Sequence, residues 1–476
     1  MAKYAPLSTS ENPSSPPTLA QERRDTKFNY IILFLFLTIG ITVLSTIPSI
    51  IYLADNESWW ESTGSTHQTS SLMEQTNTHL IEFSKTTSHP EPLPTHIGKP
   101  PKEMTKPKIV GYFTAWSIYA RGYNVYDIDA SKLTHINYAF FNLSPDGKVV
   151  SGDPWADTDK HFDGDSWNDE GTNLYGNLKQ LALLKERYSH LKVLISIGGY
   201  TWSTNFGPVT ANPVTRKTMV DSLLKLLKDF YIDGIDIDWE YPKNSREGEN
   251  YVQLVRELRN ALDDYAAEIG ETTPFLITAA LPCGPDNYNK IPLRELARYL
   301  DFLNLMAYDF AGSWLPVTGH QSNLYGKDIS VDRAVGDYLA AGPLKTQMGL
   351  APRTTESVPA LLRPVFTITS ICPWEGAVEY FDENYVAGYS YSPDSMEFVT
   401  YDTPPVIAKK VGYIKEKRLN GVMFWDLSSD VPTDDPRSLL SAAYNSFGGS
   451  QYLDNSSNHR NYPSSVYDNV RHRFGS

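Results

Sequence analysis

Cysteine is almost absent from this sequence, in which Cys283 and Cys372 are the only two among 476 residues. Two cysteines cannot build a disulfide framework or a cysteine-ligated metal site, and the sequence leaves open whether they pair. An excess of positive charge is also lacking, since the formal net charge is −14. This acidic balance argues against nucleic acids and anionic membrane surfaces as partners, because both would repel the chain.

Long hydrophobic runs are scarce, with the exception of residues 28–54, which carry no charge and are rich in Ile, Leu and Phe. This run is long enough to span a bilayer, so we predict a transmembrane signal-anchor helix. Basic residues precede the run and acidic residues follow it. The positive-inside rule then places residues 1–27, a polar disordered tail, in the cytosol. The chain is expected to be a single-pass type II membrane protein, although a cleaved secreted form remains open.

Polar segments flank the part of the chain that can fold. Residues 55–107 are rich in Ser, Thr and Pro and have no hydrophobic period, which is typical of an extended stalk. Residues 448–476 are poor in apolar residues, and we predict a disordered tail there. The predicted topology exposes the glycosylation triplets at Asn56, Asn142 and Asn455.

Between these segments, short apolar runs alternate with longer amphipathic ones. Near-continuous apolar strands that alternate with helices are typical of a parallel barrel buried on both faces, the α/β class with a (β/α)8 TIM barrel. A doubly wound open sheet is the rival fold, but it usually contains a Gly-rich phosphate turn, which is missing here. The predicted strands are residues 109–116, 135–143, 193–199, 234–240, 275–281, 302–308, 346–350 and 421–427.

Three carboxylates alternate with apolar residues in the run 233–240. Asp236, Asp238 and Glu240 fall on one face of the predicted strand, and the apolar residues between them fall on the other. Crowded carboxylates have separated pKa values, so that one stays protonated while a neighbour stays ionised. The alternatives are a solvated edge strand and a calcium loop, but a calcium loop requires Gly and Asn or Asp at turn spacing. The pattern therefore favours acid–base chemistry.

Aromatic and acidic residues gather at the predicted carboxyl ends of several strands, which form the active-site face of a (β/α)8 barrel. Aromatic rings stack on sugar rings, and carboxylates bind hydroxyl and amide groups, so this combination indicates a carbohydrate ligand. The residues at these ends are Trp116, Tyr200, Trp202, Tyr241, Met306, Tyr308, Asp309 and Trp425.

Four motifs, at residues 196–199, 233–240, 306–309 and 421–425, resemble those of one known family. The run 233–240 has the form DxxDxDxE, which is the signature of family 18 glycoside hydrolases, the chitinases. The other three are similar to this family's motifs on the third, sixth and eighth strands. The resemblance covers nearly all of residues 108–447, the expected catalytic barrel, and its details look most like fungal chitinases.

The resemblance implies a retaining, substrate-assisted hydrolysis of β-1,4-linked N-acetylglucosamine. Glu240 would protonate the glycosidic oxygen, and the substrate's own acetamide carbonyl would attack the anomeric carbon. Asp238 would stabilise the acetamide group while Asp236 shares its proton. Tyr308 would hydrogen-bond the acetamide oxygen, and Trp425 would form the floor beneath the sugar.

The same resemblance implies a chitin-binding cleft. No metal or cofactor is required, the expected partner is chitin or chitooligosaccharides, and the protein is expected to be monomeric. The catalytic domain would face the cell exterior or the secretory lumen. The implied cleft residues are Tyr112, Phe140, Tyr241, Met306 and Asp309, and the expected sugar platforms are Trp116, Tyr200 and Trp202.

The resemblance breaks after the predicted seventh strand. Residues 351–373 lack the family's Tyr-Gly-Arg run, and Arg353 is not a secure replacement. A local frame change, an altered splice and genuine divergence all fit this stretch. The pattern resumes at residue 374, and residues 374–403 resemble a small α+β insertion that walls one side of the cleft.

Two other functions occur on the same barrel, because a fold does not determine an activity. A chitin-binding lectin would bind without turnover, but such relatives commonly lack the last acid of the signature, which is Glu240 here. An endo-β-N-acetylglucosaminidase acting on N-glycans shares the signature. The walled, aromatic cleft implied by residues 374–403 favours a chitin chain.

Overall fold

The computed structural model describes residues 106–312, 314–341 and 376–475. Outside the described residues lie the predicted cytosolic tail, transmembrane helix and nearly all of the stalk, together with the predicted seventh strand and the divergent stretch 351–373. Within the described residues, no helix is both long enough and apolar enough to cross a bilayer.

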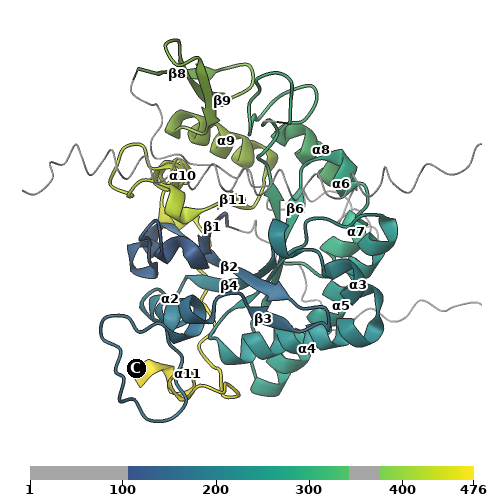
Figure 1. Ribbon diagram of the computed structural model, residues 1–476, viewed down its shortest axis with the longest axis vertical. Helices are drawn as coiled ribbons and strands as arrows, with labels where there is room; N and C mark the ends of the chain where they lie inside the picture. Colours follow the sequence, from purple (N-terminus) through teal and green to yellow (C-terminus); the bar gives the residue numbers. More distant parts are fainter. Residues whose placement is uncertain (1–105, 313, 342–375, 476) are drawn as a thin grey trace, which may run out of the picture. The chain divides into compact units, whose positions relative to one another are not determined.

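The strands of the barrel run parallel to one another in the order β11-β1-β2-β4-β5-β6-β7. They form a nearly closed barrel, consistent with the predicted (β/α)8 architecture (Figure 1). A short antiparallel strand, β3 (Val149–Ser151), pairs with β2. The parallel strands are β1 (Lys108–Thr114), β2 (His135–Leu143), β4 (Lys192–Gly198), β5 (Gly234–Asp238), β6 (Leu276–Pro282), β7 (Phe302–Met306) and β11 (Gly421–Phe424).

Five predicted strands extend beyond their observed carboxyl ends. Trp116, Glu240 and Tyr308 each follow the last residue of a strand by two positions. These residues belong to the loops at the carboxyl ends of the strands, where a (β/α)8 barrel places its active site.

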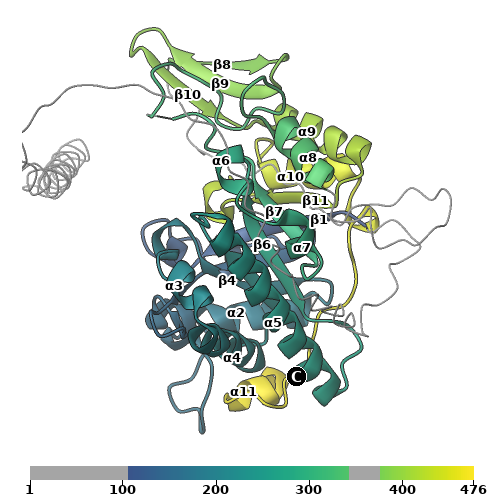
Figure 2. The same ribbon diagram turned by 90° about the vertical axis from the view of Figure 1, so that its right-hand side faces the viewer.

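Helices cover the outside of the barrel (Figure 1, Figure 2). The longest helix of the described residues, α5, buries Tyr251, Leu254, Val255 and Leu258, which follow the three-to-four spacing of one helix face. Its N-terminus is capped by the side chain of Asn244. The helices are α2 (Gly176–Arg187), α3 (Phe206–Ala211), α4 (Pro213–Asp229), α5 (Ser245–Ile269), α6 (Pro285–Tyr288), α7 (Leu293–Ala297), α8 (Val331–Ala341), α9 (Pro404–Lys417), α10 (Leu439–Phe447) and α11 (Asp468–Arg471).

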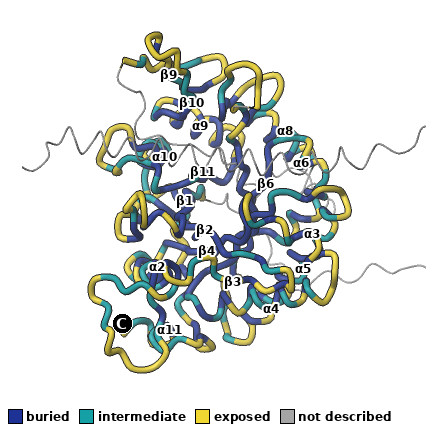
Figure 3. Tube along the Cα trace, in the orientation of Figure 1, coloured by how far each residue is buried: buried dark blue, intermediate teal, exposed yellow. Residues whose placement is uncertain are grey.

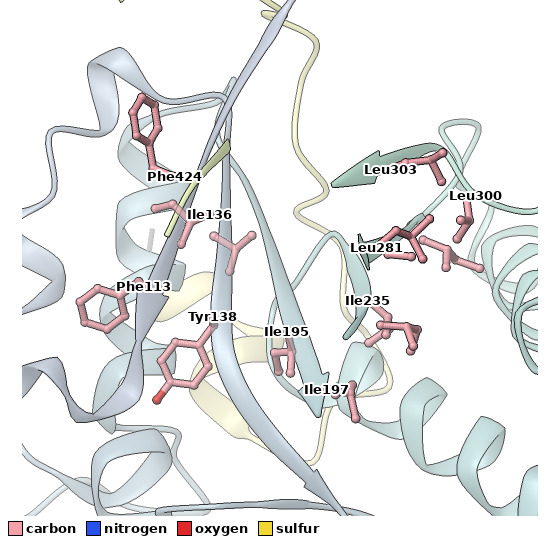
Figure 4. Packing of buried hydrophobic residues seen from close by; sticks show 14 of the residues in the cluster. Phe113, Ile136, Tyr138, Ile195, Ile197, Ile235, Leu281, Leu300, Leu303 and Phe424 are labelled. Atoms are coloured by element: carbon pink, nitrogen blue, oxygen red, sulfur yellow. The ribbon is translucent and has the colours of Figure 1, made fainter. Parts of the chain in front are cut away.

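Two hydrophobic clusters enclose the strands. The larger one lies between the strands and the helices, and Figure 4 shows members of it on neighbouring strands, including Tyr138, Ile195 and Ile235. The smaller cluster contains Val110, Tyr112, Ala139, Phe140, Phe302 and Met423, with the side chains of Trp202, Tyr308 and Trp425 packed against it. The strands are consequently buried along most of their length, while the outer loops are exposed (Figure 3). Each fully buried Leu or Ile contributes about 1.5–3 kcal/mol to this arrangement.

The predicted insertion after the seventh strand contains a three-stranded antiparallel sheet. Its strands are β8 (Val378–Asp382), β9 (Ala387–Ser392) and β10 (Glu397–Tyr401). Tyr380 lies opposite Tyr389, which lies opposite Thr400. The rings of Tyr380 and Tyr389 stack with centroids 5.1 Å apart.

The prediction of a disordered tail at 448–476 was wrong. Residues 448–475, which we name the C-terminal strap, pack against the N-terminal end of the barrel and include α11. The side chain of Asn458 donates hydrogen bonds to the carbonyls of Lys185, Tyr188 and Leu191 at 2.9–3.1 Å. The buried Tyr462 hydroxyl donates to the carbonyl of Ile232 at 2.7 Å. Polar side chains that satisfy backbone groups order this segment, so its low apolar content was misleading.

Candidate active site

The strand β5 places its acids on the inner side of the barrel. Ile235 and Ile237 belong to the outer hydrophobic cluster, and the alternation of a strand then directs Asp236 and Asp238 inward. Both aspartates are buried. Asp236 lies opposite Ser196 on β4 and Thr278 on β6. The predicted alternation of this strand is therefore confirmed.

Asp236 is the acceptor of a dense hydrogen-bond network. The hydroxyls of Tyr112 and Ser196 donate to its Oδ2 atom, each at 2.7 Å. The hydroxyl of Thr278 donates to Oδ1, and so does the amide of Asn304, at 3.2 Å. Burial, followed by the charge of Asp236, raises the pKa of Tyr112 well above its ordinary value, so this hydroxyl stays a donor. Four neutral donors thus hold the carboxylate in place.

Asp238 has a different environment. Burial raises its pKa well above the ordinary value, and the neighbouring charges of Glu240 and Asp236 raise it further. Its Oδ1 atom is buried without a hydrogen-bond partner among the described residues. These surroundings favour the protonated form of Asp238, while Asp236 accepts four hydrogen bonds.

Glu240 is partly buried and follows β5 by two residues. Burial raises its pKa, and the charge of Asp309 raises it further. Hydrogen bonds from the Tyr241 hydroxyl and the Tyr200 backbone act in the opposite direction. Glu240 therefore has the property that a general acid requires, a proton held to higher pH than on an ordinary carboxyl group.

The loop after β4 fixes the backbone of this acid. The backbone N–H of Glu240 donates to the Ser203 hydroxyl at 2.7 Å, and that hydroxyl donates to the carbonyl of Gly199 at 2.9 Å. Gly198 and Gly199 have φ angles of +105° and +75°. A Cβ atom at Gly198 would lie 2.4 Å from the Asp238 carbonyl, and one at Gly199 would lie 2.6 Å from the Phe140 ring. Only glycine permits this close approach.

Aromatic rings form a cluster inside the mouth of the barrel. The rings of Phe140 and Trp425 stack at 5.5 Å, and the ring of Tyr112 meets Trp425 edge-on at 5.4 Å. Trp116 approaches Phe140 at 6.2 Å and is 49% exposed. Tyr112 also donates to Asp236, so this aromatic cluster directly adjoins the acids.

The loop after β7 places Tyr308 and Asp309 close to the acids. Burial raises the pKa of Tyr308 well above its ordinary value, and the charges of Asp238 and Glu240 contribute because they lie close by. Asp309 has a φ angle of +56°, and burial raises its pKa.

The structure thus brings most of the predicted site residues together, with Tyr200 as the exception among the rings. The Tyr200 side chain is 83% exposed, and the residue contributes a backbone hydrogen bond to Glu240. Trp202 packs against the inner cluster, and Met306 is buried at the end of β7.

Four residues that support the acids were not among the predicted site residues. Thr278 and Asn304 hold Asp236, and their signal was a polar residue inside an otherwise apolar strand. Ser196 belongs to a recognised motif and also holds Asp236. Ser203 gave no signal, because its partner is a backbone N–H far away in the sequence.

The barrel, the row of acids and the adjoining rings are the features of a glycoside hydrolase. The chain belongs to family 18 of the glycosyl hydrolases, whose family model matches residues 108–430. It is therefore an enzyme that acts on glycosidic bonds, of the chitinase type.

Curated relatives agree with this assignment. The chain is 41% identical over 382 residues to Chitinase 1 of Aphanocladium album, covering 76% of this chain and 89% of the relative. It is 40% identical to Endochitinase 1 of Metarhizium robertsii with the same coverage.

Solved structures have the same fold. Chitinase ChiA74 of Bacillus thuringiensis superposes with a TM-score of 0.63 at 28% identity, over 72% of this chain and 70% of the other. A family 18 chitinase of Cycas revoluta, solved in complex with (GlcNAc)4, gives a TM-score of 0.58 at 25% identity, over 72% of this chain and all of the other.

Proposed function

We propose that this enzyme hydrolyses the β-1,4 linkages of chitin by a retaining, substrate-assisted mechanism. The observation that carries the proposal is the row Asp236, Asp238 and Glu240, in which burial raises the pKa of the last two acids. The charges of Glu240 and Asp236 raise the pKa of Asp238 further. The names of the similar enzymes, chitinases and endochitinases, support chitin as the substrate. The (GlcNAc)4 complex of the Cycas revoluta enzyme supports a chitooligosaccharide ligand.

In the first step, Glu240 donates its proton to the glycosidic oxygen. The sugar whose anomeric carbon forms the bond attacks that carbon with its own acetamide carbonyl. This gives an oxazolinium ion and releases the leaving sugar. Asp238 turns its unpartnered oxygen toward the acetamide N–H and passes its proton to Asp236. Glu240 then accepts a proton from water, which opens the oxazolinium ion with net retention.

The surrounding side chains orient the sugar. Tyr308 remains protonated and donates a hydrogen bond to the acetamide oxygen. Trp425, held by Phe140 and Tyr112, forms the floor beneath the ring, and the half-exposed Trp116 offers a face for a further sugar.

The test is an assay of the purified protein on soluble chitooligosaccharides. The Glu240→Gln variant is expected to lose hydrolysis while binding persists, because the amide keeps the shape of the side chain but cannot donate the proton. Glu249→Gln, an exposed position on α5, is the matched control and should be fully active. Undiminished turnover by Glu240→Gln would refute Glu240 as the acid. Binding without hydrolysis by the wild type would indicate the lectin alternative, and cleavage of N-glycans instead of chitin would indicate the endo-β-N-acetylglucosaminidase.

We also propose that residues 28–54 anchor the enzyme in a membrane, with the catalytic domain outside the cell or in the secretory lumen. The uncharged run and the charge asymmetry around it support this topology. If the domain is displayed at the cell surface, protease added to intact cells should release it. If it lies in the secretory lumen, protease added to sealed vesicles should cleave it only after detergent treatment. Cleavage without detergent in those vesicles would contradict the orientation.

A further inference from the structure

The loop that carries Tyr308 is joined to the insertion sheet by hydrogen bonds. Phe310, two residues beyond Tyr308, donates its backbone N–H to the carbonyl of Gln321 at 3.0 Å. The N–H of Gln321 in turn donates to the Thr400 hydroxyl on β10, at 3.3 Å. A short path of hydrogen bonds therefore connects the sheet with the segment that carries the tyrosine.

Two further contacts join the same loop and sheet. The Nε2 atom of His320 lies 3.3 Å from the Asp382 carboxylate at the end of β8. The backbone N–H of Tyr325 donates to the carbonyl of Tyr385 at 3.1 Å. The sheet, α8 and α9 lie side by side in both views of the molecule (Figure 1, Figure 2).

A fully buried ion pair lies beneath these contacts. The Nζ atom of Lys410, on α9, is 2.8 Å from the Oδ1 atom of Asp402, which directly follows β10, and neither side chain is exposed. The hydroxyl of Ser322 donates to Asp402 Oδ2 at 2.9 Å, and Lys410 Nζ also lies 3.4 Å from this hydroxyl. One cluster thus joins the sheet, the helix α9 and the loop after β7.

We propose that the Asp402–Lys410–Ser322 cluster positions Tyr308 for catalysis by fixing the loop after β7 against the insertion sheet and α9. The three residues are positioning residues, because they act through the loop and do not contact the sugar. The inference rests on the proposed function, in which Tyr308 binds the acetamide group.

The physical reason is the rigidity of a buried charged pair. Separating its two members would leave opposite charges apart in a low-dielectric interior, which costs free energy, so the loop segment bonded to them is held in one arrangement. Replacing Lys410 by a neutral residue removes the cation that faces the buried Asp402 carboxylate, and the local structure then rearranges to bring this carboxylate to water. Such a rearrangement would move Ser322 and Gln321, and Phe310 with them. A displacement of about 1 Å at a substrate-orienting group is enough to lower a rate strongly.

The test is a double-mutant cycle between Lys410→Met and Tyr308→Phe. Lys410→Met should lower kcat/KM on a soluble chitooligosaccharide by about tenfold in the wild-type background, but by less than about twofold when Tyr308 has already lost its hydroxyl. Lys410→Arg, which keeps the charge, should restore most of the rate. Equal losses in both backgrounds would overturn the proposal, because they would show a general loss of structure.

Lys185→Met is the matched control. Among the described residues, Lys185 and Asp233 form the other fully buried ion pair, also 2.8 Å apart, at the opposite end of the barrel. Its effect should be the same in both Tyr308 backgrounds, so coupling of Lys185 to Tyr308 as strong as that of Lys410 would also overturn the proposal.

Ser322→Ala tests the same point if Lys410→Met does not fold, since it removes one hydroxyl and leaves the ion pair. Ser322→Ala should also be coupled to Tyr308→Phe, with a smaller loss of kcat/KM. Additive effects of these two substitutions on kcat/KM would contradict the proposal. The same double-mutant cycle is also measured on binding, with the Kd for chitotetraose determined by calorimetry. An inactive wild type that still shows coupling in Kd would refute the proposed function but not the positioning role.

Discussion

Replacing Tyr241 by phenylalanine removes the hydrogen bond that the tyrosine hydroxyl donates to the Glu240 carboxylate. This bond stabilises the ionised form of Glu240, and its loss therefore raises the pKa of the acid further. The proposed mechanism needs Glu240 protonated, so activity falls as the pH rises through this pKa. The alkaline limb of the pH–rate profile is consequently expected to move to higher pH in Tyr241→Phe.

The size of the shift follows from the strength of the bond. A hydrogen bond to a charged acceptor contributes about 1.5–3 kcal/mol, and both partners are partly exposed, which favours the lower value. Since 1.36 kcal/mol corresponds to one pKa unit, we expect a shift of about one pH unit. The assay is kcat/KM on a soluble chitooligosaccharide across the pH range, because this parameter reports the free enzyme.

Asp309→Asn is the matched variant, for which we expect the alkaline limb to shift in the opposite direction. The charge of Asp309 raises the pKa of Glu240, so neutralising it should move the alkaline limb to lower pH. Asp309 is exposed, and solvent screening should keep this shift to about half a pH unit. An unmoved limb in Tyr241→Phe, or shifts of the same sign in both variants, would refute Glu240 as the titrating acid.

Two further predictions concern stability. Burial raises the pKa of the Asp157 carboxyl from 3.8 to about 6, so the folded state holds this proton more tightly than the unfolded state. Stability should accordingly decrease as the pH rises from about 4 to about 7, and Asp157→Asn should reduce that decrease by about 3 kcal/mol in urea unfolding; an equal decrease in the variant would contradict the assignment. Deleting residues 448–476 removes Asn458 and the buried Tyr462, and should lower the stability by more than the roughly 3–5 kcal/mol of a single large core truncation. Thermal unfolding of the shortened protein measures this loss, and an unchanged Tm would show that the strap is dispensable.

Much of the fold and of the acid row could be predicted from the sequence, because both depend on periodicity. The alternation at 233–240 places Ile235 and Ile237 on the face of the strand opposite Asp236, and the nearly closed barrel then turns the isoleucines outward. The aromatic residues were found at strand ends because the strands themselves were visible as apolar runs.

The remaining features depend on contacts between distant segments, which no local pattern reveals. Ser203 meets the backbone of Glu240 across two strands, and the exposed Tyr200 contributes its backbone instead of its ring. The strap is ordered by Asn458 and Tyr462, whose bonds to distant carbonyls cannot be read from composition. The first acid of the signature, Asp233, lies at the N-terminal end of the barrel, beside the strap. There it accepts a hydrogen bond from the backbone N–H of His459 at 2.7 Å.

The central claim is that the nucleophile is the substrate's own acetamide group, with Glu240 as the acid. The most direct measurement is time-resolved NMR of the reducing end released from a chitooligosaccharide, read before mutarotation. The account predicts that the β-anomer appears first, because two displacements at the anomeric carbon retain its configuration. Initial release of the α-anomer would show direct attack by water and would contradict the mechanism.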